Sequence, residues 1–287
     1  MLMSCKRLGS RIASSQSARK GLSLLLLASV SLAWQLASWA SNPAIFRYAA
    51  PSSDPAEISS SIPAGTVLPA ALNGTLSLKD AQRGQPIEAR ITQEVPLPSG
   101  SIASKSTLKG SIMSIEKDTE GSGVRLTLKF NQLEYRKETV SILTYLRAIA
   151  SLRAVRSAQV PLTGADAGTP EGWGNTVQIG GDIRYGDGGP VRNRAKLKIG
   201  KGVRGGVLVP LSANPALGCD GPVNGDNHPQ ALWIFSSDAC GVYDLKGVKI
   251  THTGKSPPEG SLTLHFDKDD MKLESGTGLL LRIVPKS

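Results

Sequence analysis

The sequence predicts a mainly β protein, with a sandwich or barrel module over residues 62–160, a second β region over residues 191–287 and one short helix near 143–158. Short segments alternate apolar and polar residues, which is typical of strands with one buried face. Turn residues separate these segments, and the turn at 62–66 nearly repeats at 97–101. Aromatic residues make up only 5% of the chain, so we expect a core of aliphatic side chains.

The N-terminus has the layout of a secretory signal. Residues 1–20 carry five basic residues and no acidic one, and residues 21–40 are uncharged and rich in leucine. Ser38 and Ala40 place small residues at positions −3 and −1 of a cleavage site. A segment of about 20 apolar residues is also long enough to be an uncleaved membrane anchor. Either interpretation exports the remainder, to the periplasm, the cell envelope or the medium.

Residues 41–61 are expected to form a flexible linker, because they are rich in proline and serine and hold few apolar residues. The formal net charge of +10 is concentrated ahead of this linker. Without the five leader residues, the 33 basic residues fall to 28 against 23 acidic ones, a net charge of +5. The chain has no dense Lys/Arg cluster with neighbouring aromatic residues, so we expect no nucleic-acid partner.

The first β module begins at a proline–glycine turn. Pro63 suits the second position of a type I turn and Gly65 the fourth. The Asn73-Gly74 pair is a strong hairpin signal between strands predicted at 67–72 and 76–78. Asn73 also begins a glycosylation sequon, but the turn interpretation is preferred.

Three later segments of the module have the alternation of half-buried strands. Their inward positions are Ile87, Ala89 and Ile91, then Leu108, Gly110 and Ile112, then Val124, Leu126, Leu128 and Phe130. Residues 118–123, which end in Gly-Ser-Gly, predict the loop of a hairpin between the last two segments. Short strands at this spacing favour a sandwich or a barrel.

The module resembles a known family in a set of short motifs. These are Ile62-Pro-Ala-Gly-Thr-Val-Leu-Pro-Ala, the segment 84–95, the second Pro-x-Gly-Ser turn, Leu108-Lys-Gly110 and the strand end Phe130-Asn-Gln-Leu133. Over about residues 62–142 the chain is similar to the C-terminal β-barrel of TrbI-like proteins, periplasmic core components of conjugation and type IV secretion machines. The resemblance implies a membrane segment, a linker and a barrel that assembles into a ring. The whole chain also resembles secreted bacterial proteins in which such a module precedes a cysteine-containing tail.

The middle of the chain predicts a strand that enters a short helix. Apolar residues recur at helical spacing from Ile142 to Val155, with Arg147 on another face, and Pro161 ends the pattern. The β-branched residues Thr139 and Val140 would also suit a continued strand. A basic amphipathic helix could contact an anionic surface, but we expect this helix to cap the barrel instead. Residues 161–190 are rich in glycine and are expected to form a long loop.

The second β region contains six strand patterns, at 195–199, 207–209, 231–235, 248–250, 262–266 and 279–284. Alternation around His265 predicts that its side chain points to solvent. Cys219 and Cys240 are the two cysteines outside the leader, and in an exported chain we expect them to form a disulfide. Closing this loop would stabilise the fold by about 3 kcal/mol. The loop residues Asp220, Asn224, Asp226, Asn227 and His228 suggest a calcium site, but their spacing is not that of an EF-hand, and we expect no metal.

Catalytic and cofactor motifs are weak. The sequence Gly200-Lys-Gly-Val-Arg-Gly205 matches a dinucleotide fingerprint, but an apolar strand follows where a helix is needed, so a turn is expected. Residues 253–256 resemble the end of a phosphate-binding loop whose first glycine is replaced by Lys249.

A penicillin-recognising serine enzyme is a remote alternative. It would use the motif pairs Ser114/Lys117, Ser212/Asn214 and His252/Gly254, in the order found in that family. That chemistry needs the serine at a helix N-terminus, and Ser114 lies in a strand pattern. We therefore expect an exported, non-enzymatic binding or structural protein without a cofactor. The alternative is a ring-forming channel subunit of a secretion machine.

Overall fold

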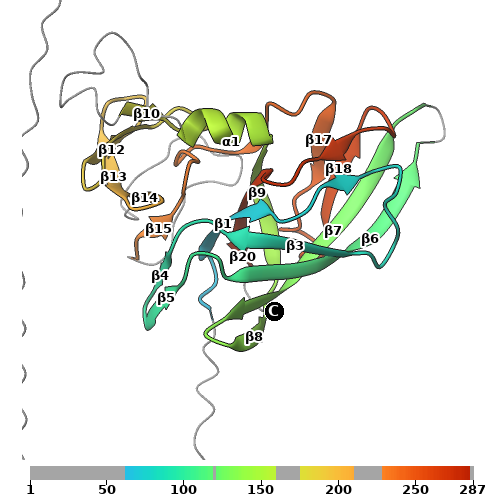
Figure 1. The fold of residues 1–287 in the computed structure, drawn as a ribbon, viewed down its shortest axis with the longest axis horizontal. Coiled ribbons are helices and arrows are strands. Elements are labelled where there is room, and N and C mark those ends of the chain that lie inside the picture. Colours follow the sequence, from blue (N-terminus) through green and yellow to red (C-terminus); the bar gives the residue numbers. More distant parts are fainter. Residues whose placement is uncertain (1–61, 119–120, 160–174, 210–227, 285–287) are drawn as a thin grey trace, which may run out of the picture. The chain divides into compact units, whose positions relative to one another are not determined.

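The computed structural model describes residues 62–118, 121–159, 175–209 and 228–284. This part is mainly β, as predicted, and contains one helix, α1 (Leu152–Gln159). The strands form one large curled sheet, a six-stranded meander and two small two-stranded sheets (Figure 1).

The large sheet is a nearly closed barrel. Its ten strands are β1 (Val67–Leu72), β3 (Pro86–Ile91), β6 (Thr107–Lys117), β7 (Val124–Tyr135), β8 (Glu138–Ser141), β9 (Thr144–Ala150), β16 (Gly241–Tyr243), β17 (Val248–His252), β18 (Leu262–Phe266) and β20 (Gly278–Ile283). Nine follow the order β16-β9-β20-β1-β3-β6-β7-β18-β17, and β8 adds to β7. Neighbours are antiparallel except β16 and β9, which are parallel. Leu146 N–H of β9 donates to the carbonyl of Thr253, just after β17, at 2.8 Å, so the two ends of the sheet meet.

Residues that alternate between buried and more exposed positions along the strands define the core of the barrel. In β3 the residues Ile87, Ala89 and Ile91 are buried and their neighbours exposed, and in β18 the buried Leu262, Leu264 and Phe266 alternate with half-buried residues. The predicted hairpin at 118–123 is confirmed, because Lys117 pairs with Val124 in antiparallel register. The barrel interior is therefore filled mostly by aliphatic side chains.

Strands β1, β9 and β20 are buried on both faces. Along β1, Leu68 belongs to the barrel core and its neighbour Val67 to a second core outside the barrel. The same division separates Ile149 from Ala148 on β9. Such strands are mostly apolar along their whole length because neither face meets water.

The second core is covered by the meander. Its antiparallel strands are β10 (Asn175–Val177), β11 (Ile183–Tyr185), β12 (Pro190–Arg192), β13 (Lys198–Val203), β14 (Gly206–Val209) and β15 (Gln230–Ala231), paired in chain order. Helix α1 contributes Val155 and Ala158, and the segment 232–235 contributes Trp233 and Phe235. The small pairs are β2 (Leu76–Ser77) with β19 (Lys272–Leu273), and β4 (Val95–Leu97) with β5 (Gly100–Ile102).

The predicted hairpin at Asn73-Gly74 is wrong. β1 is hydrogen-bonded to β20 on one side and β3 on the other, so it has no free edge for β2, which pairs with β19 instead. The first turn also differs by one position. Thr66 N–H donates to the carbonyl of Pro63 at 3.2 Å, and Gly65 is third, with φ of +83°. A positive φ there fits a type II turn.

The predicted strand that enters one short helix is confirmed, but the helix is shorter than the expected 143–158, because β9 occupies the first half of that range and α1 starts only at Leu152. A strand buried on both faces has apolar residues at every spacing, including the helical one. Arg147, expected on a polar helix face, is only 1% exposed. Its Nε donates to the carbonyl of Ala239 at 2.9 Å and its Nη2 to that of Ser237 at 3.1 Å.

The second half of the chain is organised differently from the expectation. The predicted glycine-rich loop at 161–190 contains β10 and β11 within its described part, while residues 160–174 lie outside the described residues. Four strands of the expected second β region, β16, β17, β18 and β20, complete the large sheet. The glycines of this range made it look like a loop, but β10 and β11 themselves contain none.

Candidate functional site

A polar pocket lies where the end of α1, the strands β10 and β11 and the β13–β14 turn meet the segment around Trp233. Its volume is about 320 Å³, at the lower end of the range for ligand sites. The lining residues that carry its chemistry are Gln159, Thr176, Gln178, Arg184, Asp187 and Trp233. They come from four separate segments, so only the folded chain brings them together.

Two buried glutamines hold the main chain of Trp233 beside this pocket. Trp233 N–H donates to Gln93 Oε1 at 2.6 Å. Gln178 Nε2 donates to the carbonyls of Trp233 at 3.2 Å and Phe235 at 2.9 Å. Gln93 Nε2 also donates to the carbonyl of Val207 at 2.8 Å. Gln93 and Gln178 thus form a clamp on the main chain of Trp233, and this clamp is joined to β14.

The clamped residue is strained. Trp233 has φ of +53°, a left-handed conformation that is costly for a bulky side chain. Such conformations persist only where the surroundings fix them, and they cluster at binding sites. Gly206 leaves room for this arrangement, because a Cβ there would lie 2.5 Å from Trp233 Cα.

Several polar groups of the pocket have hydrogen-bonding capacity that the described residues leave unused. Arg184 Nη1 donates to the carbonyl of Gly206 at 3.2 Å, and its other N–H groups have no partner in the described segments. Asp187 is exposed and forms no ion pair there. Gln178 Oε1 is buried without a hydrogen bond within the described part of the chain. Arg184 and Asp187 therefore give the pocket unused donors and acceptors.

Asp182, just before β11, is a second unusual carboxyl group. It is fully buried, and its Oδ2 accepts a hydrogen bond from Ser237 N–H at 2.6 Å. Burial raises the pKa of Asp182, and the hydrogen bond from Ser237 only partly opposes this effect. The neutral acid is therefore favoured in the folded protein more than in the unfolded chain.

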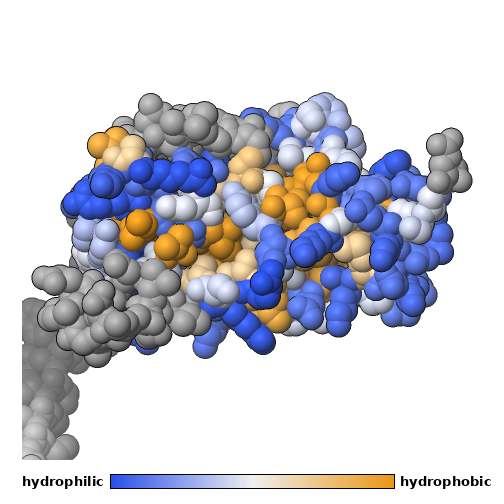
Figure 2. All heavy atoms as spheres, turned by 90° about the horizontal axis from the view of Figure 1, so that it is seen from above, coloured by the Kyte–Doolittle hydropathy of each residue, from blue (hydrophilic) through white to orange (hydrophobic). Residues whose placement is uncertain are grey.

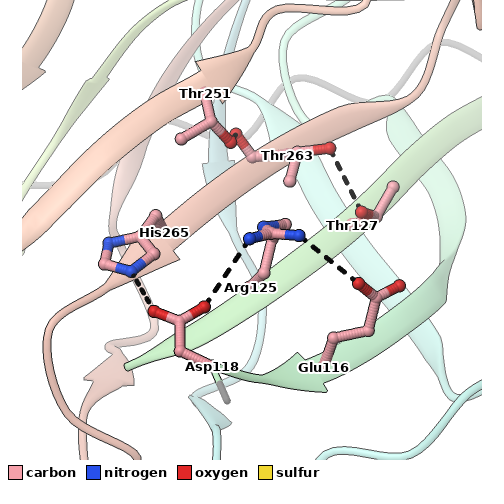
Figure 3. Close-up of polar contacts among 7 residues, drawn as sticks. All are labelled: Glu116, Asp118, Arg125, Thr127, Thr251, Thr263 and His265. Carbon is pink, nitrogen blue, oxygen red and sulfur yellow. Dashed lines mark hydrogen bonds and ion pairs between the residues drawn. The ribbon is translucent and has the colours of Figure 1, made fainter. Parts of the chain in front are cut away.

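A charged cluster lies on the outer face of β6, β7 and β18 (Figure 3). His265 Nε2 lies 2.7 Å from Asp118 Oδ2, and Arg125 lies 3.6 Å from both Asp118 Oδ1 and Glu116 Oε2. Gly123 lies beneath this contact, since a Cβ there would be 2.9 Å from His265 Nε2. The outward direction predicted for His265 is correct, but its bond to Asp118 was not predicted.

This cluster is better suited to joining strands than to catalysis. The second ring nitrogen of His265, Nδ1, faces Asp267 Oδ1 at 3.8 Å. No hydroxyl group is hydrogen-bonded to His265 within the described segments. Thr127 and Thr263 bond each other across the same strands at 3.1 Å. The cluster thus fastens β18 to the β6–β7 hairpin.

The serine-enzyme motifs are not brought together. Ser114 and Lys117 both lie on β6, and residues three apart on a strand point to opposite faces. Lys117 Nζ instead contacts Asp269 Oδ2 at 3.1 Å. His252 Nδ1 lies 2.7 Å from the carbonyl of Ser261, within its own hairpin. Ser212 and Asn214 are outside the described residues.

The other sequence motifs have mixed outcomes. Gly200 to Gly205 lie in the β13–β14 hairpin, as the turn interpretation predicted, and Gly205 lines the pocket. Sequence reasoning missed this pocket, because its polar residues share no spacing pattern. Cys240 N–H donates to Tyr243 Oη at 3.0 Å, but Cys219 lies outside the described residues, so the disulfide stays a prediction.

Two further expectations concern metal and membrane. Residues 220, 224, 226 and 227 are outside the described residues, and within the described ones no three His, Cys, Asp or Glu residues are grouped to hold a metal ion. The expected leader at 1–40 is also outside them. No helix in the described segments is long and apolar enough to cross a membrane.

Comparison with known proteins finds no matching family model, no matching curated protein and no matching solved structure.

Proposed function

We propose that the protein is an exported, non-enzymatic binding protein of the cell envelope or the medium, and that its ligand occupies the polar pocket. The strained Trp233 main chain beside unsatisfied polar groups is the observation that carries this proposal. Holding a bulky residue at positive φ destabilises the fold. A binding site accounts for that cost, because two buried glutamines are committed to fixing one wall of the pocket.

The surface outside the pocket offers less for recognition. Hydrophilic residues cover the barrel end in Figure 2, and hydrophobic atoms reach the surface toward the middle. The large hydrophobic side chains that are strongly exposed in the described part are Met113, Val177 and Leu197. They lie on different elements, and single exposed apolar residues are common. Export is supported by the leader composition described above.

The test combines mass and ligand screening of the purified exported protein. We expect an intact mass that lacks the leader, and a rise in Tm with one class of small polar compound. The variant Gln159→Trp, which places a ring at the exposed rim, should abolish this rise, whereas Gln132→Trp on the outer face of β7 should retain it. A rise that survives Gln159→Trp would contradict the pocket. Labelling of Ser114 by a β-lactam probe would contradict the non-enzymatic assignment.

A ring-forming channel subunit is the second candidate function. The nearly closed barrel, whose strands β1, β3, β6, β7 and β8 fall in the TrbI-like segment, favours it. A large detergent-extracted oligomer with an intact leader would support the ring in native mass measurements. A cleaved, soluble monomer would exclude it.

A further inference from the structure

We propose that the ligand of the pocket is a small zwitterion of the α-amino acid type, with its carboxylate on Arg184 and its ammonium group on Asp187. This inference rests on the proposed binding function and names the ligand class. It follows from the charge pattern of the pocket, which combines one cation and one anion that do not neutralise each other.

Arg184 is placed to receive a carboxylate. Only its Nη1 is engaged, by the carbonyl of Gly206 at 3.2 Å, and this bond orients the guanidinium group. The remaining N–H groups make no other contact in the described residues, and guanidinium geometry matches a carboxylate in a bidentate manner. The stem of Arg184 is held against β13, since a Cβ on Gly202 would lie 3.2 Å from its Cγ and Cδ.

Asp187 supplies the opposite charge at the rim of the same pocket. It lies in the β11–β12 turn, between Gly186 and Gly188, whose φ values are +57° and +77°. Asp187 and Arg184 form no ion pair with each other, although both line the pocket. A simple anion bound to Arg184 would be repelled by the carboxylate of Asp187. A simple cation bound to Asp187 would be repelled by the guanidinium group of Arg184. A zwitterion satisfies both groups at once.

The rest of the pocket suits the side chain of such a ligand. Thr176 and Gln159 offer a hydroxyl and an amide, and Ala158 and Ile234 offer an apolar wall. A volume of about 320 Å³ leaves space beyond the charged groups of an amino acid. A neutral polyol would use the hydroxyl and the amide but would leave both charges without a partner.

Calorimetry of the purified exported protein with L-serine, acetate, ethylammonium and glucose tests this inference. We expect L-serine to bind at least about tenfold more tightly than acetate or ethylammonium, since each analogue loses a charged hydrogen bond. Arg184→Gln should weaken L-serine binding about tenfold or more. The matched control is Arg192→Gln, because Arg192 lies in the same meander and also donates to a carbonyl, that of Lys196, but does not line the pocket.

Asp187→Asn gives a readout that misfolding cannot imitate. It should weaken L-serine binding and strengthen acetate binding, because the repelling carboxylate is gone. Absence of L-serine binding, or L-serine binding unchanged in Arg184→Gln and Asp187→Asn, would overturn the zwitterion. Glucose binding that Gln159→Trp abolishes would also overturn it while preserving the proposed binding function. If no polar compound binds the pocket at all, both proposals fail.

Discussion

Gln93 Oε1 accepts the main-chain N–H of Trp233 at 2.6 Å, across 140 positions of sequence. The contact joins the loop between β3 and β4 to the segment that follows β15. Both partners are buried, so the bond is shielded from water. It fixes Trp233, whose main chain is strained beside the pocket.

Replacing Gln93 by leucine should leave the N–H of Trp233 buried without an acceptor. We expect a loss of about 1–3 kcal/mol in the free energy of unfolding, measured by urea denaturation. Gln132→Leu, on an exposed position of β7, is the control and should change stability by less than about 0.5 kcal/mol. Equal losses in the two variants would show that the clamp contributes nothing special.

Gly206→Ala should destabilise the protein and disturb the pocket together. The added methyl group would lie 2.5 Å from Trp233 Cα. The shifts needed to remove such overpacking should lower the free energy of unfolding by about 1–3 kcal/mol. Thermal denaturation and the near-ultraviolet signal of tryptophan measure both effects. Gly74→Ala is the matched control, since nothing lies within 4 Å of a Cβ there. A stable Gly206→Ala protein would mean that the Trp233 segment moves freely.

The His265–Asp118 contact should couple two strands only modestly. Both side chains are partly exposed, at 22% and 29%, and exposed ion pairs contribute about 0.2–1 kcal/mol. A double-mutant cycle with His265→Ala and Asp118→Ala, followed by urea denaturation, gives the coupling energy. A coupling above about 2 kcal/mol would point to a role beyond joining β18 to the hairpin.

Asp182 should make the protein less stable as the pH rises. Burial raises its pKa above the ordinary value of 3.8, so the folded state retains a proton that the unfolded chain has already lost. Stability therefore falls as the pH increases from about 3.8 through the higher folded-state pKa. Asp182→Asn should remove this fall, while Asp187→Asn at an exposed position should keep it. Parallel profiles for the wild type and Asp182→Asn would contradict the raised pKa.

Ser151 should be needed for both α1 and the pKa of Asp244. Its Oγ accepts the N–H of Ala154 at 3.0 Å, as an N-cap, and donates to Asp244 Oδ2 at 2.5 Å. This donation and Arg153 lower the pKa of Asp244. The stability that Asp244 contributes is thus present above pH 3.8 and is lost as the pH falls through the lower folded-state pKa.

Ser151→Ala should cost about 1 kcal/mol for the lost cap and raise the pKa of Asp244 toward its ordinary value. Urea denaturation measures the first effect and an NMR titration of the carboxyl group the second. Ser157→Ala, at an exposed helix position, should produce neither. An unchanged titration of Asp244 would remove Ser151 as the cause.

Strands with one solvent-exposed face could be predicted from the sequence, because their residues alternate between apolar and polar. The other strands could not. Alternation in β3, β7 and β18 reports burial directly. In β9, burial on both faces erases alternation, and the segment was mistaken for a helix. The candidate pocket could not be foreseen, since Gln93, Gln178 and Arg184 are ordinary residues whose roles arise from contacts across the chain. Pairing of β1 with β20 was equally hidden, because no local pattern encodes a partner about 200 residues away.

The pairing of β1 with β20 affects how the protein folds. β1, the first described strand, lies against β20, the last, with Val67 opposite Arg282 and Ala71 opposite Gly278. During synthesis, β1 therefore keeps one apolar edge unpaired until β20 has been made. Folding with such long-range pairing is slow, because the entropy of bringing distant segments together is lost before their contacts stabilise the fold. A truncation that removes only the final strand would open the barrel wall from end to end.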